Sequence, residues 1–260
     1  MERNPNFTYY EYSDENLEMA QTIFKAYIKS FQEFTKEKNG VNLGFKVIQQ
    51  RNDSWREGGF FFKVLKDHPE TEPLAVQLAE ELVNWGYAEY DGDFEFNGEM
   101  PFGMYLLGKL AEHNPKHIHY LIKFMEGDDL NHPNEHYYVI RDVLNASDWC
   151  EEAIDLAVAC SIIPGQRGCD QVAECVDDTF RSEVIFNQYL KKLTEKHYID
   201  LSRISTRFTN WKQVEYEIPY LFMIMENVFE GADGEALEEV YFKLVFDGVM
   251  PTYQLLKDAI

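Results

Sequence analysis

The sequence predicts an all-α fold built from stacked pairs of helices. Two observations support this prediction. Apolar residues recur at helical spacing along most of the 260-residue chain, and a weak internal repeat of 32 to 33 residues runs from about residue 101 to residue 193. One short segment, residues 89–100, departs from the helical pattern and is expected to form a β-hairpin-like insertion.

The first helix is expected between Ser13, a residue type that caps helix starts, and the turn signal Asn39-Gly40. Apolar side chains alternate at spacings of three and four residues and therefore share one face. They are Leu17, Ala20, Phe24, Tyr27, Phe31 and Phe34. The stripe is short for an independent coiled coil, so packing on the rest of this chain is favoured over dimerisation.

An earlier, loosely related helix pair is expected from Trp55 to Tyr87, with Thr71 as a cap before an apolar stripe. The repeat proper follows. In the first helix of each unit, the equivalent apolar positions are Leu107, Leu110 and Ala111, then Ile140, Val143 and Leu144, then Val172, Cys175 and Val176. In the second helix they are Leu121, Phe124 and Met125, then Ile154, Ala157 and Val158, then Phe186, Tyr189 and Leu190.

Between the two helices of each unit stands a residue whose side-chain oxygen can accept a backbone amide at a helix start. These residues are Asn114, Ser147 and Thr179, and Pro115 after Asn114 suits the first helical position. A single helix pair cannot bury its own apolar face, whereas stacked pairs build a continuous core. The sequence therefore predicts an alpha solenoid, with further helices near residues 211–229 and 235–246.

In its paired helices, residues 101–193 resemble the HEAT and armadillo class, and in repeat length they are nearer to ankyrin repeats. The ankyrin Thr-Pro-Leu-His signature is absent, and 33 residues is short for a HEAT repeat. Stacked repeats of this class would build a continuous core with an extended surface. Three segments are expected within one continuous domain: an N-terminal helical segment 1–66, an acidic repeat core 67–193 and a C-terminal helical segment 194–260.

The net charge of −22 is concentrated in the middle of the chain. Residues 67–178 contain 5 basic and 24 acidic residues, whereas residues 1–66 contain 10 and 9. Such a block repels nucleic acid and anionic lipid and speeds encounter with a basic protein. No apolar run is long enough to span a membrane, and no secretory leader is recognised, so a cytoplasmic protein is expected.

Two predicted helices carry acidic stripes without a lysine on the same helix to balance them. The candidate partner-binding residues there are Asp148, Glu151, Glu152 and Asp155 on one helix and Glu174, Asp177 and Asp178 on the next, together with Asp170. Because like charges on one helix face repel, a cationic partner would relieve this repulsion. A merely solvated polar face is the alternative interpretation.

The insertion EYDGDFEFNGEM, residues 89–100, alternates acidic and aromatic residues. A calcium loop of the EF-hand type would need glycine where Phe96 stands, so a hairpin is favoured. Such a hairpin would either cover the edge of the solenoid or reach a partner with Asp93, Phe94, Glu95 and Phe96.

Catalytic signatures are weak. The pairs His113/His117 and His132/His136 have metal-ligand spacing, but the cap at Asn114 separates the first pair, so their side chains are not required to converge. Cys150, Cys160, Cys169 and Cys175 form no CxxC pair and are interpreted as buried reduced thiols rather than as a metal site or disulfides.

The leading hypothesis is therefore a non-enzymatic module, without cofactor or metal, whose acidic surface binds a basic protein. One form of it is an inhibitor or immunity protein that neutralises a nucleic-acid-acting toxin by placing carboxylates where phosphates would sit. A metal-dependent enzyme that uses His113, His117, His132 and His136 is the alternative.

Overall fold

A computed structural model describes residues 21–22, 25, 28–29, 65–85, 102–126, 138–162 and 166–260. Most of these residues are helical and none lies in a strand, which confirms the all-α prediction for the described chain. In the same residues, no helix has the length and apolar character that crossing a membrane requires. The chain divides into two compact units, residues 1–129 and 130–260, and each is described separately below.

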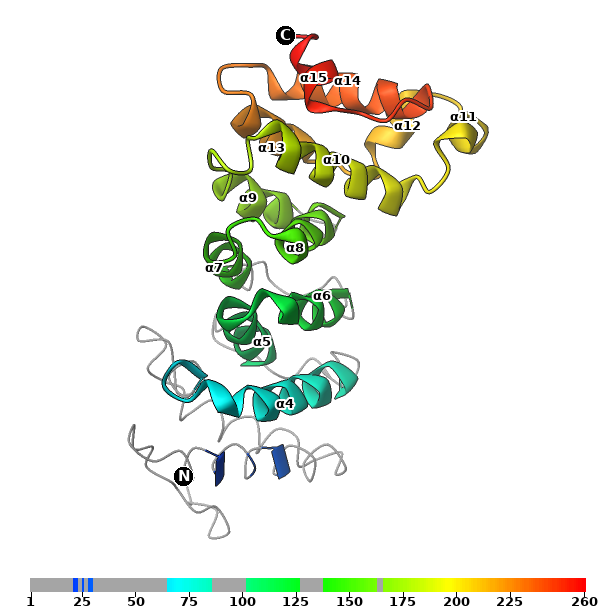
Figure 1. Ribbon diagram of the computed structural model, residues 1–260. Helices are drawn as coiled ribbons and strands as arrows, with labels where there is room; N and C mark the ends of the chain where they lie inside the picture. Colours follow the sequence, from blue (N-terminus) through cyan, green and yellow to red (C-terminus); the bar gives the residue numbers. More distant parts are fainter. Residues whose placement is uncertain are drawn as a thin grey trace, which may run out of the picture. The chain divides into compact units, whose positions relative to one another are not determined.

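The elements of the first unit whose bounds the structure describes are α-helices and short 3-10 turns (Figure 1). In chain order they are η2 (Pro69–Thr71), α4 (Glu72–Trp85), α5 (Phe102–His113), η4 (Pro115–His117) and α6 (Ile118–Glu126). Helix α4 packs against both α5 and α6, which also pack against each other. The core is formed by residues spaced three or four apart on these helices, among them Leu78, Leu110 and Leu121, all fully buried.

The second unit is a longer series of helices, drawn from green to red in Figure 1. They are α7 (Tyr138–Ala146), α8 (Glu151–Ile162), α9 (Gln166–Glu174), α10 (Glu183–His197), η6 (Leu201–Arg203), α11 (Ile204–Arg207), α12 (Trp211–Glu215), α13 (Leu221–Val228), α14 (Gly234–Phe246) and α15 (Tyr253–Lys257). Helices therefore lie at the positions that the repeat predicts.

Within the second unit, helices pack on the following helix, as α7 does on α8 and α8 on α9, and also on helices further along the chain. Helix α7 contacts α9 and α9 contacts α13, while α8 contacts α10. Helices α13 and α14, joined by the turn at residues 229–233, pack closely on each other as a hairpin, and α12 packs on α14. The apolar residues assigned to the repeat are buried in α7, α8 and α10. In the first helix of the third repeat, Val172 and Cys175 are buried but Val176 is partly exposed.

Two pairs of buried hydroxyl groups join the helices around α10. Tyr189 Oη lies 2.7 Å from Ser161 Oγ of α8, and Tyr241 Oη of α14 lies 3.0 Å from Thr194 Oγ1. Ser161 and Thr194 also donate to the carbonyl oxygens of residues four positions earlier in their own helices. These buried polar groups are thus hydrogen-bonded, as an apolar core requires.

The predicted cap at Asn114 is confirmed, because its side chain accepts a hydrogen bond from Lys116 N and Pro115 opens η4. The caps predicted at Ser147 and Thr179 are wrong. Ser147 Oγ donates to Leu144 O, and the cap of α10 is Ser182, whose Oγ accepts from Ile185 N. The turn before α10 is longer than the repeat suggests, so the cap lies three residues further on.

The cap predicted at Thr71 is also wrong. Thr71 forms the last residue of η2, and its hydroxyl donates to His68 O instead of accepting an amide. Several other predictions lie outside the described residues. They concern most of the first helix, of which only Gln21, Thr22, Lys25, Ile28 and Lys29 are described, and the hairpin at 89–100. The segment boundaries at 66 and 193 stay predictions.

Candidate acidic binding site

Three turns of the second unit carry a concentration of carboxylates. They join α7 to α8, α9 to α10 and α13 to α14. Together with the first turn of the helix that follows each, they contribute nine acidic residues, which we call the acidic edge: Asp148, Glu151, Glu152, Asp177, Asp178, Glu183, Glu230, Asp233 and Glu235. Arg181 is the single Lys or Arg within these stretches, residues 147–152, 176–183 and 229–235.

Two contacts hold the three turns next to one another. The ring of Trp149, in the first turn, lies 4.2 Å from that of Phe180, in the second, measured between centroids. Arg181 links the second turn to the third, because its Nε donates to Asn227 O at 3.0 Å and its Nη1 lies 2.7 Å from Glu230. The carboxylates of the edge are thereby gathered on neighbouring turns.

The first turn has an unusual backbone. Asp148 and Trp149 both have φ of 51°, in the left-handed region that L-residues other than Asn and Asp rarely adopt. This conformation leaves Asp148 exposed while Trp149, only 3% exposed, inserts beneath the turn and meets Phe180. Burial of the indole offsets the cost of the left-handed backbone.

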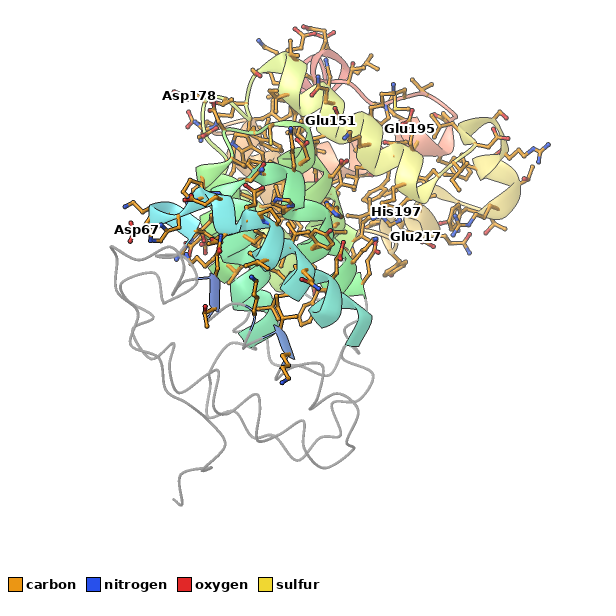
Figure 2. All side chains as sticks on the ribbon, turned by 60° about the horizontal axis from the view of Figure 1, so that its bottom comes forward. Asp67, Glu151, Asp178, Glu195, His197 and Glu217 are labelled. Carbon is orange, nitrogen blue, oxygen red and sulfur yellow. The ribbon has the colours of Figure 1, made fainter. Side chains whose placement is uncertain are left out.

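Some carboxylates of the edge also have a structural role. Asp177 Oδ1 accepts hydrogen bonds from the backbone amides of Thr179 and Phe180, each at 2.9 Å. Asp233 caps α14 by accepting from Ala236 N at 3.1 Å. Glu183 and Glu235 stand in the first turns of α10 and α14, where the helix dipole favours negative charge. Asp178, labelled in Figure 2, is in contrast fully exposed, and its carboxylate lies 3.6 Å from Arg181 Nη1.

The expectation that the acidic stripes lack a balancing cation is wrong for part of the set. Lys192 of α10 lies 2.6 Å from Asp155 and 3.3 Å from Glu151 of α8. Although its burial acts to lower the pKa of Lys192, hydrogen bonds to these two carboxylates raise it above its ordinary value. The spacing along α8 could not show this ion pair, because the lysine comes from the helix packed beside it.

Glu174 is likewise paired with a cation from another helix, since its Oε2 lies 3.5 Å from Arg141 Nη1 of α7. The predicted partner-binding residues are therefore divided. Asp148, Glu152, Asp177 and Asp178 belong to the edge with Glu151, while Asp155 and Glu174 lie beyond the turns. Asp170 stands on α9, half-buried, and Asp93, Phe94, Glu95 and Phe96 lie outside the described residues.

The sequence analysis missed four acids of the edge, Glu183, Glu230, Asp233 and Glu235. They lie in residues 179–260, which contain 9 basic and 13 acidic residues, so the charge count by segment did not single them out. Their position could have identified them, because each stands in a turn before a helix or in the first turn of that helix.

The first unit contains a cluster that was not expected. His113 ends α5 and His117 lies in η4, but both imidazoles approach the carboxylate of Glu72 at the start of α4. Asn114 Nδ2 donates to the same carboxylate at 2.8 Å. The hydrogen bond to His117 is the main cause that lowers the pKa of Glu72. The two histidines do lie in separate elements, as expected, but a third residue brings their side chains to one carboxylate.

The described residues offer no group of three His, Cys, Asp or Glu side chains placed to hold a metal ion. His132 and His136 lie outside them. The four cysteines are free thiols, of which Cys160, Cys169 and Cys175 are buried as predicted and Cys150 is partly exposed. Burial raises the pKa of both Cys169 and Cys175 to about 12, so neither is a nucleophile near neutral pH.

Comparison with protein-family models, with curated proteins and with solved structures finds no match to this chain.

Proposed function

We propose that the protein is a non-enzymatic binding module whose acidic edge docks a basic protein. The observation that carries this proposal is the gathering of nine carboxylates on three adjacent turns that contain one arginine. Acids at helix starts stabilise helices, which accounts for some of them. It does not account for Asp148, Asp178 and Glu230, which precede the helices and cap none of them.

Preorganisation of the edge supports the same proposal. The Trp149–Phe180 contact and the Arg181 links fix the turns before any partner arrives. A partner therefore gains electrostatic attraction without the entropic cost of ordering loops. Opposite charge chiefly increases the association rate, and the effect weakens as salt shortens the screening length to about 8 Å near physiological ionic strength.

We further propose that the second unit is built as an alpha solenoid of stacked helix pairs. The contacts of α7 with α9, of α9 with α13 and of α8 with α10 support this arrangement, because a solenoid repeat contacts its neighbours in this way. In that arrangement, equivalent turns of successive pairs lie along one side, which explains why acids in separate repeats collect on one surface.

A specific form of this function is an inhibitor or immunity protein of a nucleic-acid-acting toxin, acting in the cytoplasm. Carboxylates on consecutive turns offer a basic groove the same sign of charge that a phosphate backbone offers. The protein itself, at −22, would repel nucleic acid, so its target would be the basic protein and not the nucleic acid.

The proposal is tested by titrating a fluorescently labelled oligolysine peptide, with fluorescence anisotropy as the readout. One variant combines Asp148→Lys, Asp178→Lys and Glu230→Lys. The matched control combines Glu195→Lys, Glu239→Lys and Asp258→Lys, exposed acids that lie outside the edge. Both variants change the net charge equally.

The wild type is expected to bind the peptide with an affinity that falls as salt is raised. The edge variant should lose about tenfold or more in affinity, whereas the control variant should stay within about twofold of wild type. Equal losses in the two variants would show that only net charge matters and would overturn the proposal. Circular dichroism at neutral pH checks that both variants are folded.

A further inference from the structure

The start of α13 is capped by a carboxyl group from another helix. Tyr220 precedes α13 and makes no side-chain cap hydrogen bond. Instead, the backbone amide of Phe222 donates to Glu238 Oε2 of α14 at 2.5 Å. Glu238 is only 6% exposed, so an acidic side chain lies within the contact between the two helices.

The two helices lie very close together beside this contact. Gly234 stands one turn before Glu238 on α14, and a Cβ atom added to it would lie 2.4 Å from Phe222 O. At this point α14 is in direct contact with the backbone of α13. There is consequently no room for a hydration shell around Glu238 while the hairpin stays closed.

The charged groups that act on Glu238 do not compensate a negative charge. They are the carboxylates of Glu215 on α12 and Glu235 on α14. The thiol of Cys169 on α9 also faces it. Burial raises the pKa of Glu238 to about 8, although the hydrogen bond from Phe222 acts to lower it. Burial outweighs that hydrogen bond, so the carboxyl is protonated when the hairpin is closed at neutral pH.

We propose that Glu238 is a pH-sensitive latch: its neutral carboxyl holds the start of α13 against α14, and its ionisation releases it. An ionised carboxylate next to Glu215 and Glu235 is more stable in water than in the closed contact. To reach water it must leave Phe222, and α13 then loses its cap.

The direction of the pH dependence follows from the sign of the shift. The pKa of Glu238 is raised in the folded state above its ordinary value of 4.5. Its contribution to stability is therefore fully present below pH 4.5 and is lost as the pH rises through about 8. The closed hairpin is therefore expected to lose stability progressively between pH 4.5 and about 8, and to lose no more above that pH.

Hydrogen exchange of the α13 amides tests the latch in the full-length protein, after correction for the intrinsic pH dependence of exchange. In the wild type, protection should fall by up to about tenfold for each pH unit between pH 4.5 and about 8, where the open state is ionised and the closed state is not, and should level off above about 8. In Glu238→Gln, a side chain of the same shape that cannot ionise, protection should be independent of pH. Glu239→Gln, an exposed neighbour on the same helix, should behave as wild type.

A second variant distinguishes ionisation of Glu238 from a general alkaline loosening. Glu215→Gln removes one negative neighbour, so Glu238 should ionise more easily, and the transition, the pH at which protection stops falling, should move to lower pH. Constant protection in the wild type between pH 5 and about 8 would overturn the proposal. So would a transition unchanged in Glu215→Gln. If Glu238→Gln fails to fold at neutral pH, the wild type and Glu215→Gln still decide the question.

Discussion

Glu72 Oε1 and His117 Nε2 lie 2.5 Å apart, although 45 positions separate the two residues in the sequence. With His113 and Asn114 on the same carboxylate, this contact fastens the start of α4 to the turn between α5 and α6. His113 and His117, which have the spacing of metal ligands, thus hold helices together through a shared carboxylate.

Replacing Glu72 should weaken the first unit. Glu72→Ala removes hydrogen bonds to a charged acceptor, and we expect a loss of about 1 to 2 kcal/mol in the free energy of unfolding. Because the pKa of Glu72 is lowered, its contribution is present above pH 4.5 and is lost as the pH falls through the folded value. In thermal melts, the difference between wild type and Glu72→Gln should therefore shrink below pH 4.5.

The same measurement separates packing from metal binding. If the cluster is complete without a metal, a chelator should leave the melting temperature unchanged. A drop that is restored by zinc, and that is absent in His117→Ala, would instead favour the metal-enzyme alternative.

The caps of α10 offer a test of the turn that the sequence misjudged. Ser182→Ala should destabilise the protein by about 1 kcal/mol, because Ile185 N loses its acceptor. Thr179→Ala, an exposed position three residues earlier, should change stability by less than about 0.5 kcal/mol. Urea unfolding measures both, and the reverse order would contradict the assigned cap.

The two left-handed residues before α8 should respond in opposite ways. Asp148→Gly removes the steric cost at φ of 51° and should leave the protein as stable or more stable by up to about 1 kcal/mol. Trp149→Ala empties the space against Phe180 and should cost about 3 to 5 kcal/mol. Thermal unfolding measured beside wild type reports both changes, and equal effects would refute the role given to Trp149.

Two glycines of the C-terminal hairpin should differ for separate reasons. Gly234→Ala places a methyl group against the backbone of α13, and overpacking of this kind costs about 1 to 3 kcal/mol. Gly231→Ala meets nothing within 4 Å, but its φ of 81° is strained for alanine and should cost about 1 kcal/mol. Chemical denaturation of the two variants should rank Gly234→Ala as the less stable.

The sequence predicted the helices better than it predicted their ends or the candidate site. Apolar spacing located α5 to α10 because the period of a helix is visible in one segment at a time. The cap at Asn114 was correctly placed, but Ser147 and Thr179 were chosen by their offset from it, and turns of different length break that offset. The links Lys192–Asp155 and Arg181–Glu230 join different helices, so no pattern within one helix could reveal them.

The hydroxyl pairs around α10 fix the alignment of three helices. Sliding α10 by one turn along its neighbours would move Tyr189 and Thr194 by about 5.4 Å, beyond reach of both Ser161 and Tyr241. An apolar interface alone tolerates such a slip, because one leucine can replace another in the same space. Here every misaligned state leaves hydroxyl groups without partners in a dry interior. The two tyrosines therefore fix the position of α10 along its neighbours. An insertion of one helical turn on either side of them would break these hydrogen bonds and destabilise the protein.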